Sequence, residues 1–200
     1  MVRQPKTRSR PRLAAADWVQ AALAAIAEGG LAAVAVEPLA RRLEVSKGSF
    51  YWHFPNRDAL VAATLEEWER AETERPIERV RVVGDPAERL RALTAAAFAD
   101  RTGGLRDAAL AASADHPLVQ PVLRRVTARR LAYLADAFAE LGCPEADARR
   151  RALLVYTAYL GLFHYLRATG PAGLTEAELR AYARDLLDAF VQPRRGAKRS

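Results

Sequence analysis

Residues Leu39 to Phe54 read LARRLEVSKGSFYWHF, a stretch that predicts two short helices joined by a tight turn. Leu39 and Leu43 repeat at helical spacing and end the first helix. The turn closes at Ser46, whose hydroxyl is a good N-cap because it can accept a hydrogen bond from a free backbone N–H of the next helix. The pattern therefore predicts a helix-turn-helix.

The second of these helices, from about Lys47 to Phe54, has one apolar face and one polar face. Phe50 and Phe54 lie four residues apart and are expected in the core. The remaining positions carry a cation, a hydroxyl group and aromatic edges: Lys47, Ser49, Tyr51, Trp52 and His53. A helix this short buries too little surface to be a core element, whereas it suits a probe that enters a groove of DNA.

The run VSKGSFYWHF from Val45, followed by PNRDAL from Pro55, resembles the N-terminal DNA-binding domain of the TetR family of bacterial transcriptional regulators. The resemblance covers about residues 14–68. Two positions depart from the pattern. Glu44 occupies a turn position where the family often has glycine, so a left-handed backbone there would be strained. Ala35 stands where a threonine often contacts a phosphate.

The resemblance implies a set of DNA-contacting residues on this helix and at the start of the next: Lys47, Gly48, Ser49, Tyr51, Trp52, His53 and Arg57. Lys47 can reach a guanine edge or a phosphate, and Arg57 adds a phosphate anchor at a helix N-terminus. Two alternatives stay open. Gly48 either allows a close backbone approach or is a simple helix-start residue, and His53 either contacts a phosphate or is a packed, hydrogen-bonded histidine.

The charge distribution separates two basic ends from an acidic body. Residues 1–12 carry five cations and no acid, and residues 193–200 carry four cations, so the body has a net charge of −2 although the whole chain carries +7. We expect a disordered basic arm over 1–12 that contacts phosphates, and a basic tail over 193–200. Between them we expect a helix-turn-helix domain over 13–58 and an effector-binding and dimerisation domain over 59–192.

Nothing in the sequence indicates catalysis, a cofactor or a bound metal. The three histidines lack the spacing of metal ligands, and the one cysteine, Cys143, cannot form an internal disulfide. No signal peptide is recognisable, and no apolar stretch reaches the ~20 residues of a membrane helix. We therefore expect a cytoplasmic protein that is not an enzyme.

Helix start and stop signals divide the chain into about nine helical segments with no convincing strand, which predicts an all-α fold. Asp85-Pro86 and Thr175 to Glu178 are start signals for two of these helices. Pro76 is expected to stop the fourth helix, and Gly103-Gly104 is expected to break the chain between two others.

The last two helices predict a homodimer. The eighth is apolar almost all round, so it must be covered on two sides, and small residues on one side allow a partner helix to approach closely. The predicted interface comprises Leu154, Thr157, Ala158, Gly161, Tyr165, Leu179, Tyr182, Leu186 and Phe190. The alternative is that both faces belong to the core of one chain, and the family resemblance favours the dimer.

Six aromatic side chains can line a ligand cavity enclosed by the fourth to eighth helices: Trp68, Phe98, Tyr133, Tyr156, Tyr159 and Phe163. The alternative for each of them is core packing. Because no buried basic pair is recognisable, a mostly apolar or aromatic effector is the better match. The sequence thus predicts a repressor that such a ligand releases from a palindromic operator in double-stranded DNA. The alternative is a regulator without an effector, controlled by a protein partner or by abundance.

Overall fold

The computed structural model describes residues 13–170 and 174–191 of the chain. Within these two ranges every regular element is a helix, so the all-α prediction is confirmed. The predicted basic arm over 1–12 and tail over 193–200 lie outside the described residues.

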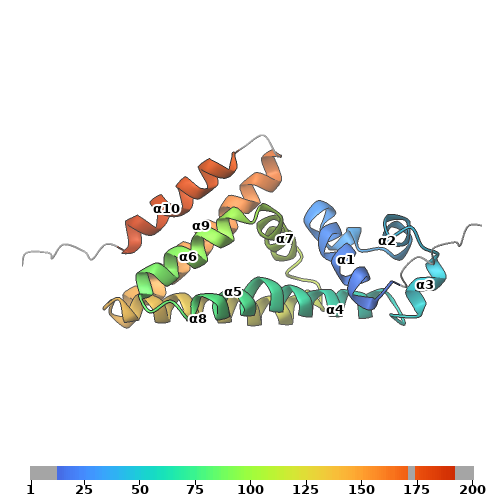
Figure 1. Ribbon diagram of the computed structural model, residues 1–200, viewed down its shortest axis with the longest axis horizontal. Coiled ribbons are helices and arrows are strands. Elements are labelled where there is room, and N and C mark those ends of the chain that lie inside the picture. Colours follow the sequence, from blue (N-terminus) through green and yellow to red (C-terminus); the bar gives the residue numbers. More distant parts are fainter. Residues whose placement is uncertain (1–12, 171–173, 192–200) are drawn as a thin grey trace, which may run out of the picture.

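The N-terminal helices form one end of an elongated molecule (Figure 1). They are α1 (Ala15–Gly29), the short 3-10 turn η1 (Leu31–Ala33), α2 (Val36–Arg42) and α3 (Lys47–Tyr51). The predicted helix-turn-helix is present as α2 and α3, although α3 ends at Tyr51 rather than at Phe54. Phe54 follows in the next turn and is still buried, so both phenylalanines belong to the core as expected.

A long helical rod leads away from this end, and the prediction that Pro76 stops it is wrong. The rod consists of α4 (Arg57–Glu69), the π-helical turn η2 (Arg70–Glu74) and α5 (Arg75–Val80), with Pro76 in the first turn of α5. A proline inside a helix leaves the carbonyl four residues earlier without its backbone donor. Here that carbonyl belongs to Glu72, and Arg130 Nη2 donates a hydrogen bond of 3.1 Å to it.

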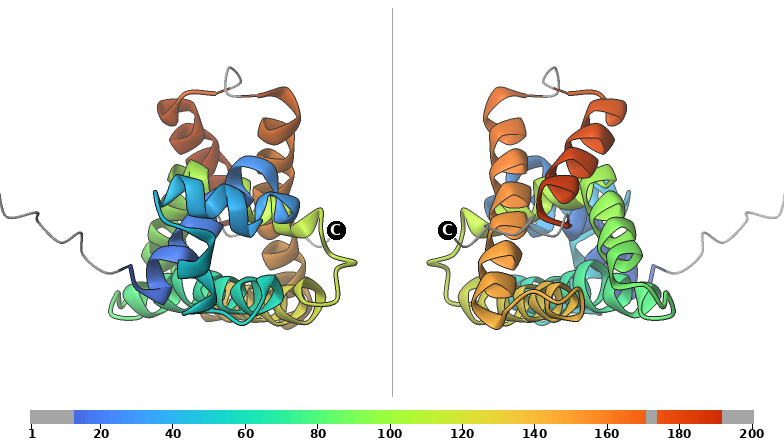
Figure 2. Two further views of the ribbon diagram at one scale, coloured as in Figure 1. Left: turned by 90° about the vertical axis from the view of Figure 1, so that its right-hand side faces the viewer. Right: turned by 90° about the vertical axis from the view of Figure 1, so that its left-hand side faces the viewer.

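The remaining helices build the larger half of the molecule around this rod. They are α6 (Pro86–Ala99), α7 (Arg101–Ala111), α8 (Val119–Glu140), α9 (Glu145–Thr169) and α10 (Glu176–Val191). The predicted start signals are confirmed, because the Asp85 carboxylate accepts a hydrogen bond from the backbone N–H of Ala87 and Thr175 forms a reciprocal cap with Glu178. The rod and α8 lie side by side along one edge, and α10 packs along α6 (Figures 1 and 2).

Gly103 and Gly104 lie inside the first turn of α7, so the break expected there is wrong. The chain turns at Asp100 instead, whose carboxylate accepts a hydrogen bond of 2.9 Å from the backbone N–H of Gly103. The glycines are needed for close packing, because a Cβ atom on Gly104 would overlap the ring of Phe163 in α9.

The two halves share a hydrophobic core rather than meeting at a polar boundary. The largest cluster of buried side chains joins the N-terminal helices to α4 and also contains Ala109, Leu110, Val119 and Val126 from α7 and α8. A movement of α7 or of the rod therefore displaces side chains that pack against α1, because packed side chains do not deform independently.

Candidate nucleic-acid interface and ligand cavity

Helix α3 is anchored by one aromatic ring and presents two others to solvent. Phe50 is fully buried, and its ring meets that of Trp18 in α1 edge to face at 5.3 Å. Tyr51 and Trp52 are 55% and 84% exposed. Two neighbouring aromatic side chains therefore face solvent at this end of the helix.

Lys47, at the N-terminal end of α3, is bonded within the protein. Its Nζ lies 2.8 Å from Oε1 of Glu37 in α2, and both side chains are largely exposed. The hydrogen bond, together with the opposite charge, raises the pKa of Lys47 and lowers the pKa of Glu37. Lys47 is thus fully charged near neutral pH, and any contact with DNA replaces or shares its bond with Glu37.

The turn between α2 and α3 has the strain that the sequence predicted. Glu44 adopts a φ of 54°, and it is the one described non-glycine residue with a positive φ. Ser46 occupies the N-cap position of α3, but its side chain makes no capping hydrogen bond, which corrects that part of the prediction. Ala35 begins α2 without a side-chain cap.

The fold itself does not require a glycine at position 48. A Cβ atom there would lie 3.6 Å from Oγ of Ser46, an ordinary contact, and the φ of Gly48 is not in the left-handed region. Both alternatives for Gly48, a close backbone approach and a simple helix-start residue, therefore stay predictions. Ser49 and His53 are partly exposed beside it, within reach of the same surface.

Arg57 holds the N-terminal helices together. Its Nε donates a hydrogen bond of 2.6 Å to the carbonyl oxygen of Val34, and Nη2 donates one of 2.9 Å to that of Leu31. Nη1 lies 3.6 Å from a carboxylate oxygen of Asp58. The sequence missed this bracing role, because the two carbonyl groups lie more than 20 residues earlier in the chain.

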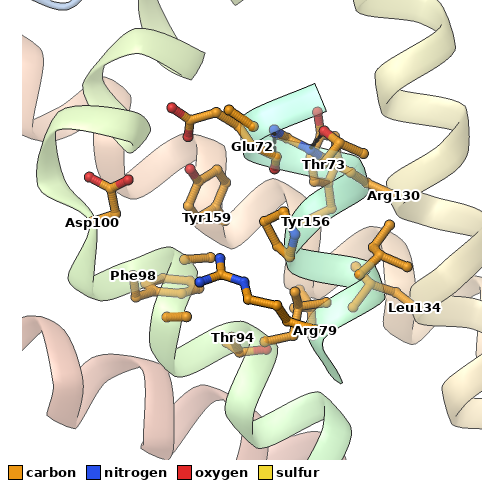
Figure 3. A pocket seen from close by; sticks show the side chains of 17 residues that line it. Glu72, Thr73, Arg79, Thr94, Phe98, Asp100, Arg130, Leu134, Tyr156 and Tyr159 are labelled. Carbon is orange, nitrogen blue, oxygen red and sulfur yellow. Dashed lines mark hydrogen bonds between the residues drawn. The ribbon is translucent and has the colours of Figure 1, made fainter. Parts of the chain in front are cut away.

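A cavity of about 500 Å³ opens between η2, α5, α6, α8 and α9 (Figure 3). Its volume falls within the usual range for small-molecule sites. Of the six aromatic residues predicted to line it, Phe98, Tyr156 and Tyr159 do so. The wall also carries charged residues that the sequence did not single out: Glu72, Arg79, Asp100 and Arg130.

The other three aromatic residues are not part of the cavity wall. Trp68 is buried, and its Nε1 donates a hydrogen bond of 2.7 Å to Asp107. Phe163 is fully buried against Gly104. The hydroxyl of Tyr133 is buried without a hydrogen-bond partner in the described part of the chain. None of the three therefore lines this cavity. Core packing, the alternative, describes Trp68 and Phe163, whereas Tyr133 is only partly buried.

A buried ion pair underlies the cavity. Arg130 Nη1 donates a hydrogen bond of 2.5 Å to Oδ2 of Asp107, and the same oxygen accepts one of 3.0 Å from the hydroxyl of Tyr159. Burial alone lowers the pKa of Arg130, but the charge and the hydrogen bond of Asp107 outweigh it and raise the pKa. Arg130 Nε also donates to Thr73, so each of its three nitrogens donates a hydrogen bond within the protein.

Glu72 is a titratable group in the cavity wall. Burial raises the pKa of Glu72 to about 7, and the neighbouring carboxylates of Asp107 and Asp100 add to this, while Arg106 and Arg130 oppose it. Figure 3 shows Glu72 and Asp100 at one end of the cavity, and the Arg79 guanidinium pointing between Phe98 and Tyr156.

The predicted dimer residues divide into two groups. On α9, Leu154, Thr157, Gly161 and Tyr165 are exposed and Ala158 is partly exposed, whereas the bulky face of the same helix is buried in the protomer. On α10, Leu179 is fully buried in a cluster with Phe98, which leaves it no surface for a partner, so its assignment to the interface is wrong. Tyr182 is half-exposed, and Leu186 and Phe190 are partly buried in the same chain.

Two other expectations concern the described residues only. Within 13–170 and 174–191 there is no group of three or more histidine, cysteine or acidic residues that could hold a metal ion. No helix in these ranges is both long enough and apolar enough to span a membrane.

Comparisons with known proteins agree with this architecture. Residues 19–64 match the sequence profile of the family described as bacterial regulatory proteins, tetR family. The HTH-type transcriptional regulator BetI of Paraburkholderia xenovorans (strain LB400) is 30% identical over 188 residues, which cover 90% of this chain and 94% of that protein.

Two solved structures, each of a protein with a bound ligand, have the same fold. A transcriptional regulator from Saccharomonospora viridis in complex with choline has a TM-score of 0.74 at 18% identity, covering 87% of this chain and 95% of the other. FadR from Bacillus subtilis in complex with stearoyl-CoA has a TM-score of 0.70 at 18% identity, covering 88% and 97%.

Proposed function

Because this chain belongs to the TetR family of bacterial regulatory proteins, and is therefore a DNA-binding transcriptional regulator, we propose that it is a repressor released from its operator by a small ligand. The observation that carries the DNA-binding part is the geometry of α3, where Phe50 fixes the helix while Tyr51 and Trp52 face solvent.

The proposed DNA contacts are made by the exposed part of α3 and by its flanks. This surface consists of Lys47, Gly48, Ser49, Tyr51, Trp52 and His53. Arg57 holds the preceding segment in place through the carbonyls of Leu31 and Val34, and its Nη1 donors are proposed to bind a phosphate. The helix-turn-helix domain spans 13–58, and the arm over 1–12 adds phosphate contacts next to it.

The proposed operator is palindromic because the protein is proposed to be a homodimer with two-fold symmetry. Its interface is the exposed face of α9, formed by Leu154, Thr157, Ala158, Gly161 and Tyr165, with Tyr182 of α10 beside it. Two copies of α3 about 34–36 Å apart fit successive major grooves of DNA. Gly161 supports this assignment, since no other described residue of its own chain beyond the adjoining helix backbone lies within 4 Å of a Cβ atom built there.

The proposed effector occupies the cavity beside Phe98, Tyr156 and Tyr159. The mostly apolar wall favours a ligand with an apolar or aromatic body, and the charged side chains at its ends favour polar groups on that body. A cavity of about 500 Å³ favours an effector-controlled regulator over one controlled by a protein partner or by abundance. An effector acts only to the extent that it binds the two DNA-affinity states unequally.

The proposal is tested by selecting DNA from a random pool with the purified protein and measuring the affinity of the selected site. We expect a palindrome, with Lys47→Ala and Tyr51→Phe both weakening its binding. Choline and stearoyl-CoA, the ligands of the two structural neighbours, are the first compounds to test for release of that DNA. Selection of no sequence would refute the DNA-binding role, and tight ligand binding without release would favour the effector-independent alternative.

The dimer is tested separately by sedimentation. Gly161→Arg places a long charged side chain in the proposed interface, and a buried unpaired charge is strongly unfavourable. We expect the variant to sediment as a folded monomer or to aggregate. An unchanged dimer would place the interface elsewhere.

A further inference from the structure

Two side chains join the cavity wall to helix α1. Glu72, in η2, lines the cavity and forms an ion pair with Nη1 of Arg106 in α7. Nε of Arg106 donates a hydrogen bond of 3.0 Å to the carbonyl oxygen of Leu23, in the middle of α1. A single guanidinium group therefore contacts both the cavity wall and the helix that supports α3.

The ion pair is shielded from water. The side chains of Arg106 and Glu72 are only 12% and 14% exposed. An ion pair in such surroundings responds strongly to any new charge or hydrogen-bond donor placed beside it, because the effective dielectric constant is lower than in water. Surface ion pairs of the same chain lack this sensitivity, since solvent and salt screen them.

Glu72 and Asp100 both line the cavity, and one carboxylate oxygen of each lies close to Gly103. Oε2 of Glu72 and Oδ2 of Asp100 are the atoms nearest to the position that a Cβ on Gly103 would occupy, and no described residue donates a hydrogen bond to either oxygen. Figure 3 shows both carboxylates at the same end of the cavity. The missing side chain at Gly103 thus leaves two acceptor oxygens beside each other at the cavity wall.

We propose that Arg106 transmits the occupancy of the cavity to α1, and that an effector acts by bringing a hydrogen-bond donor or a positive charge to Glu72. Such a group competes with Arg106 for the carboxylate and loosens the bond between Arg106 and Leu23. This inference rests on the proposed function, because it takes the cavity to be the effector site.

A proton is a simple probe of this connection. The charged groups that face Glu72 are Arg106 and Asp107 of α7, Asp100 at the junction of α6 and α7, and Arg130 of α8. With a pKa of about 7, the Glu72 carboxyl is mostly protonated at pH 6 and mostly ionised at pH 8. Protonation removes the charge that holds Arg106, much as a competing ligand group does.

The test compares Glu72→Gln with Glu74→Gln. Glu74 lies in the same turn but outside the cavity wall, and it pairs with Arg129 near the surface. At pH 8 we expect Glu72→Gln to speed amide hydrogen exchange across residues 15–29 and to weaken binding to the selected DNA by about 5–150-fold, the usual size of allosteric coupling. Glu74→Gln should match the wild-type protein in both measurements.

Two further measurements make the result decisive. At pH 6 the protection factors of α1 in the wild-type protein, which correct for the slower intrinsic exchange at lower pH, should approach those of Glu72→Gln at pH 8, with no substitution involved. Arg106→Lys keeps a cation for Glu72 but lacks the Nε donor to Leu23, so it should also speed exchange in α1.

The inference is overturned if α1 exchanges equally fast in the wild-type protein, Glu72→Gln and Arg106→Lys at pH 8. Failure of the proposed function gives a different result, in which the wild-type protein selects no DNA. The exchange of α1 then still decides whether Glu72 and α1 are connected.

Discussion

On α3, Tyr51 and Trp52 extend into solvent from a helix that Phe50 anchors, whereas beneath the cavity Asp107 and Arg130 bond to one another and to the helices around them. Both regions hold side chains in a set geometry. In the first the geometry comes from apolar packing behind the exposed surface, and in the second it comes from buried hydrogen bonds that are themselves part of the core.

The exposed side of α3 can change with little effect on stability, whereas the buried network cannot. Replacing an outward side chain on α3 removes only exposed surface and leaves the packing of Phe50 intact. Replacing a member of the buried network leaves other polar groups without partners, which costs much more than the bond itself contributes. The exposed side chains of α3 can therefore be substituted with little loss of stability, while those bonded to Arg130 cannot.

The largest expected effect comes from removing the acid of the buried pair. Asp107→Ala leaves the Arg130 guanidinium buried without its counter-ion and should lower the free energy of unfolding by about 3–5 kcal/mol. Glu145→Ala removes an exposed pair with Arg149 and should cost only about 0.3–0.5 kcal/mol. Urea denaturation of both variants measures the contrast, and two equally small losses would contradict a network that is part of the core.

A smaller effect concerns pH. The folded-state pKa of Glu72 is about 7, above its usual 4.5, so the folded protein binds this proton more tightly than the unfolded chain does. The free energy of unfolding should therefore fall as the pH rises from about 4.5 to 7. The shift corresponds to about 1–3 kcal/mol after allowance for residual solvent contact.

Glu72→Gln isolates this contribution. Urea denaturation of the variant and of the wild-type protein at pH 5.5 and pH 8 gives a difference in which the other titrating groups largely cancel. We expect the wild-type protein to lose more stability than Glu72→Gln between these pH values. Equal losses would show that Glu72 is ionised in the folded protein throughout.

A third prediction concerns binding rather than folding. Trp52→Ala should leave the free energy of unfolding within about 0.5 kcal/mol of the wild-type value, because the side chain is 84% exposed. It should weaken binding to the selected DNA by about 1–3 kcal/mol. Val82→Ala is the control, since Val82 is equally exposed but lies in the turn between α5 and α6. If both variants bind DNA with equal affinity, Trp52 is not part of the interface.

The same contrast explains what could be predicted from the sequence. The two sides of this region follow from spacing within a few residues, since Phe50 faces the core while its neighbours Tyr51 and Trp52 face solvent. The strain at Glu44 is equally local, because it depends on the backbone of one turn. The role of Arg57 near α3 could not be predicted from local spacing. Its hydrogen-bond partners are the carbonyl groups of Leu31 and Val34, at the start of η1 and just after it.

The cavity could not be predicted in the same way. Arg130 bonds to Thr73 and to the carbonyl of Glu72, which lie 57 and 58 residues earlier in the chain. Such contacts have no periodicity along the sequence. For the same reason the sequence pattern wrongly predicts helix breaks at Pro76 and Gly103. The donor from Arg130 that satisfies the carbonyl freed by Pro76 comes from a distant helix. The close packing that requires a glycine at position 103 likewise arises only in the folded chain.

The sharpest separation of folding from binding concerns Gly48. The protein itself has room for a methyl group there, and alanine favours a helix over glycine by up to about 1 kcal/mol. Gly48→Ala should therefore keep or slightly raise the free energy of unfolding while weakening binding to the selected DNA, because the added methyl group stands where the DNA backbone approaches. Gly84→Ala is the matched control, since a Cβ atom at Gly84 meets nothing within 4 Å and the residue lies far from α3. Thermal denaturation and a DNA titration of both variants provide the measurements. If Gly48→Ala binds DNA as tightly as Gly84→Ala, then Gly48 is only a helix-start residue and the close approach takes place elsewhere on α3.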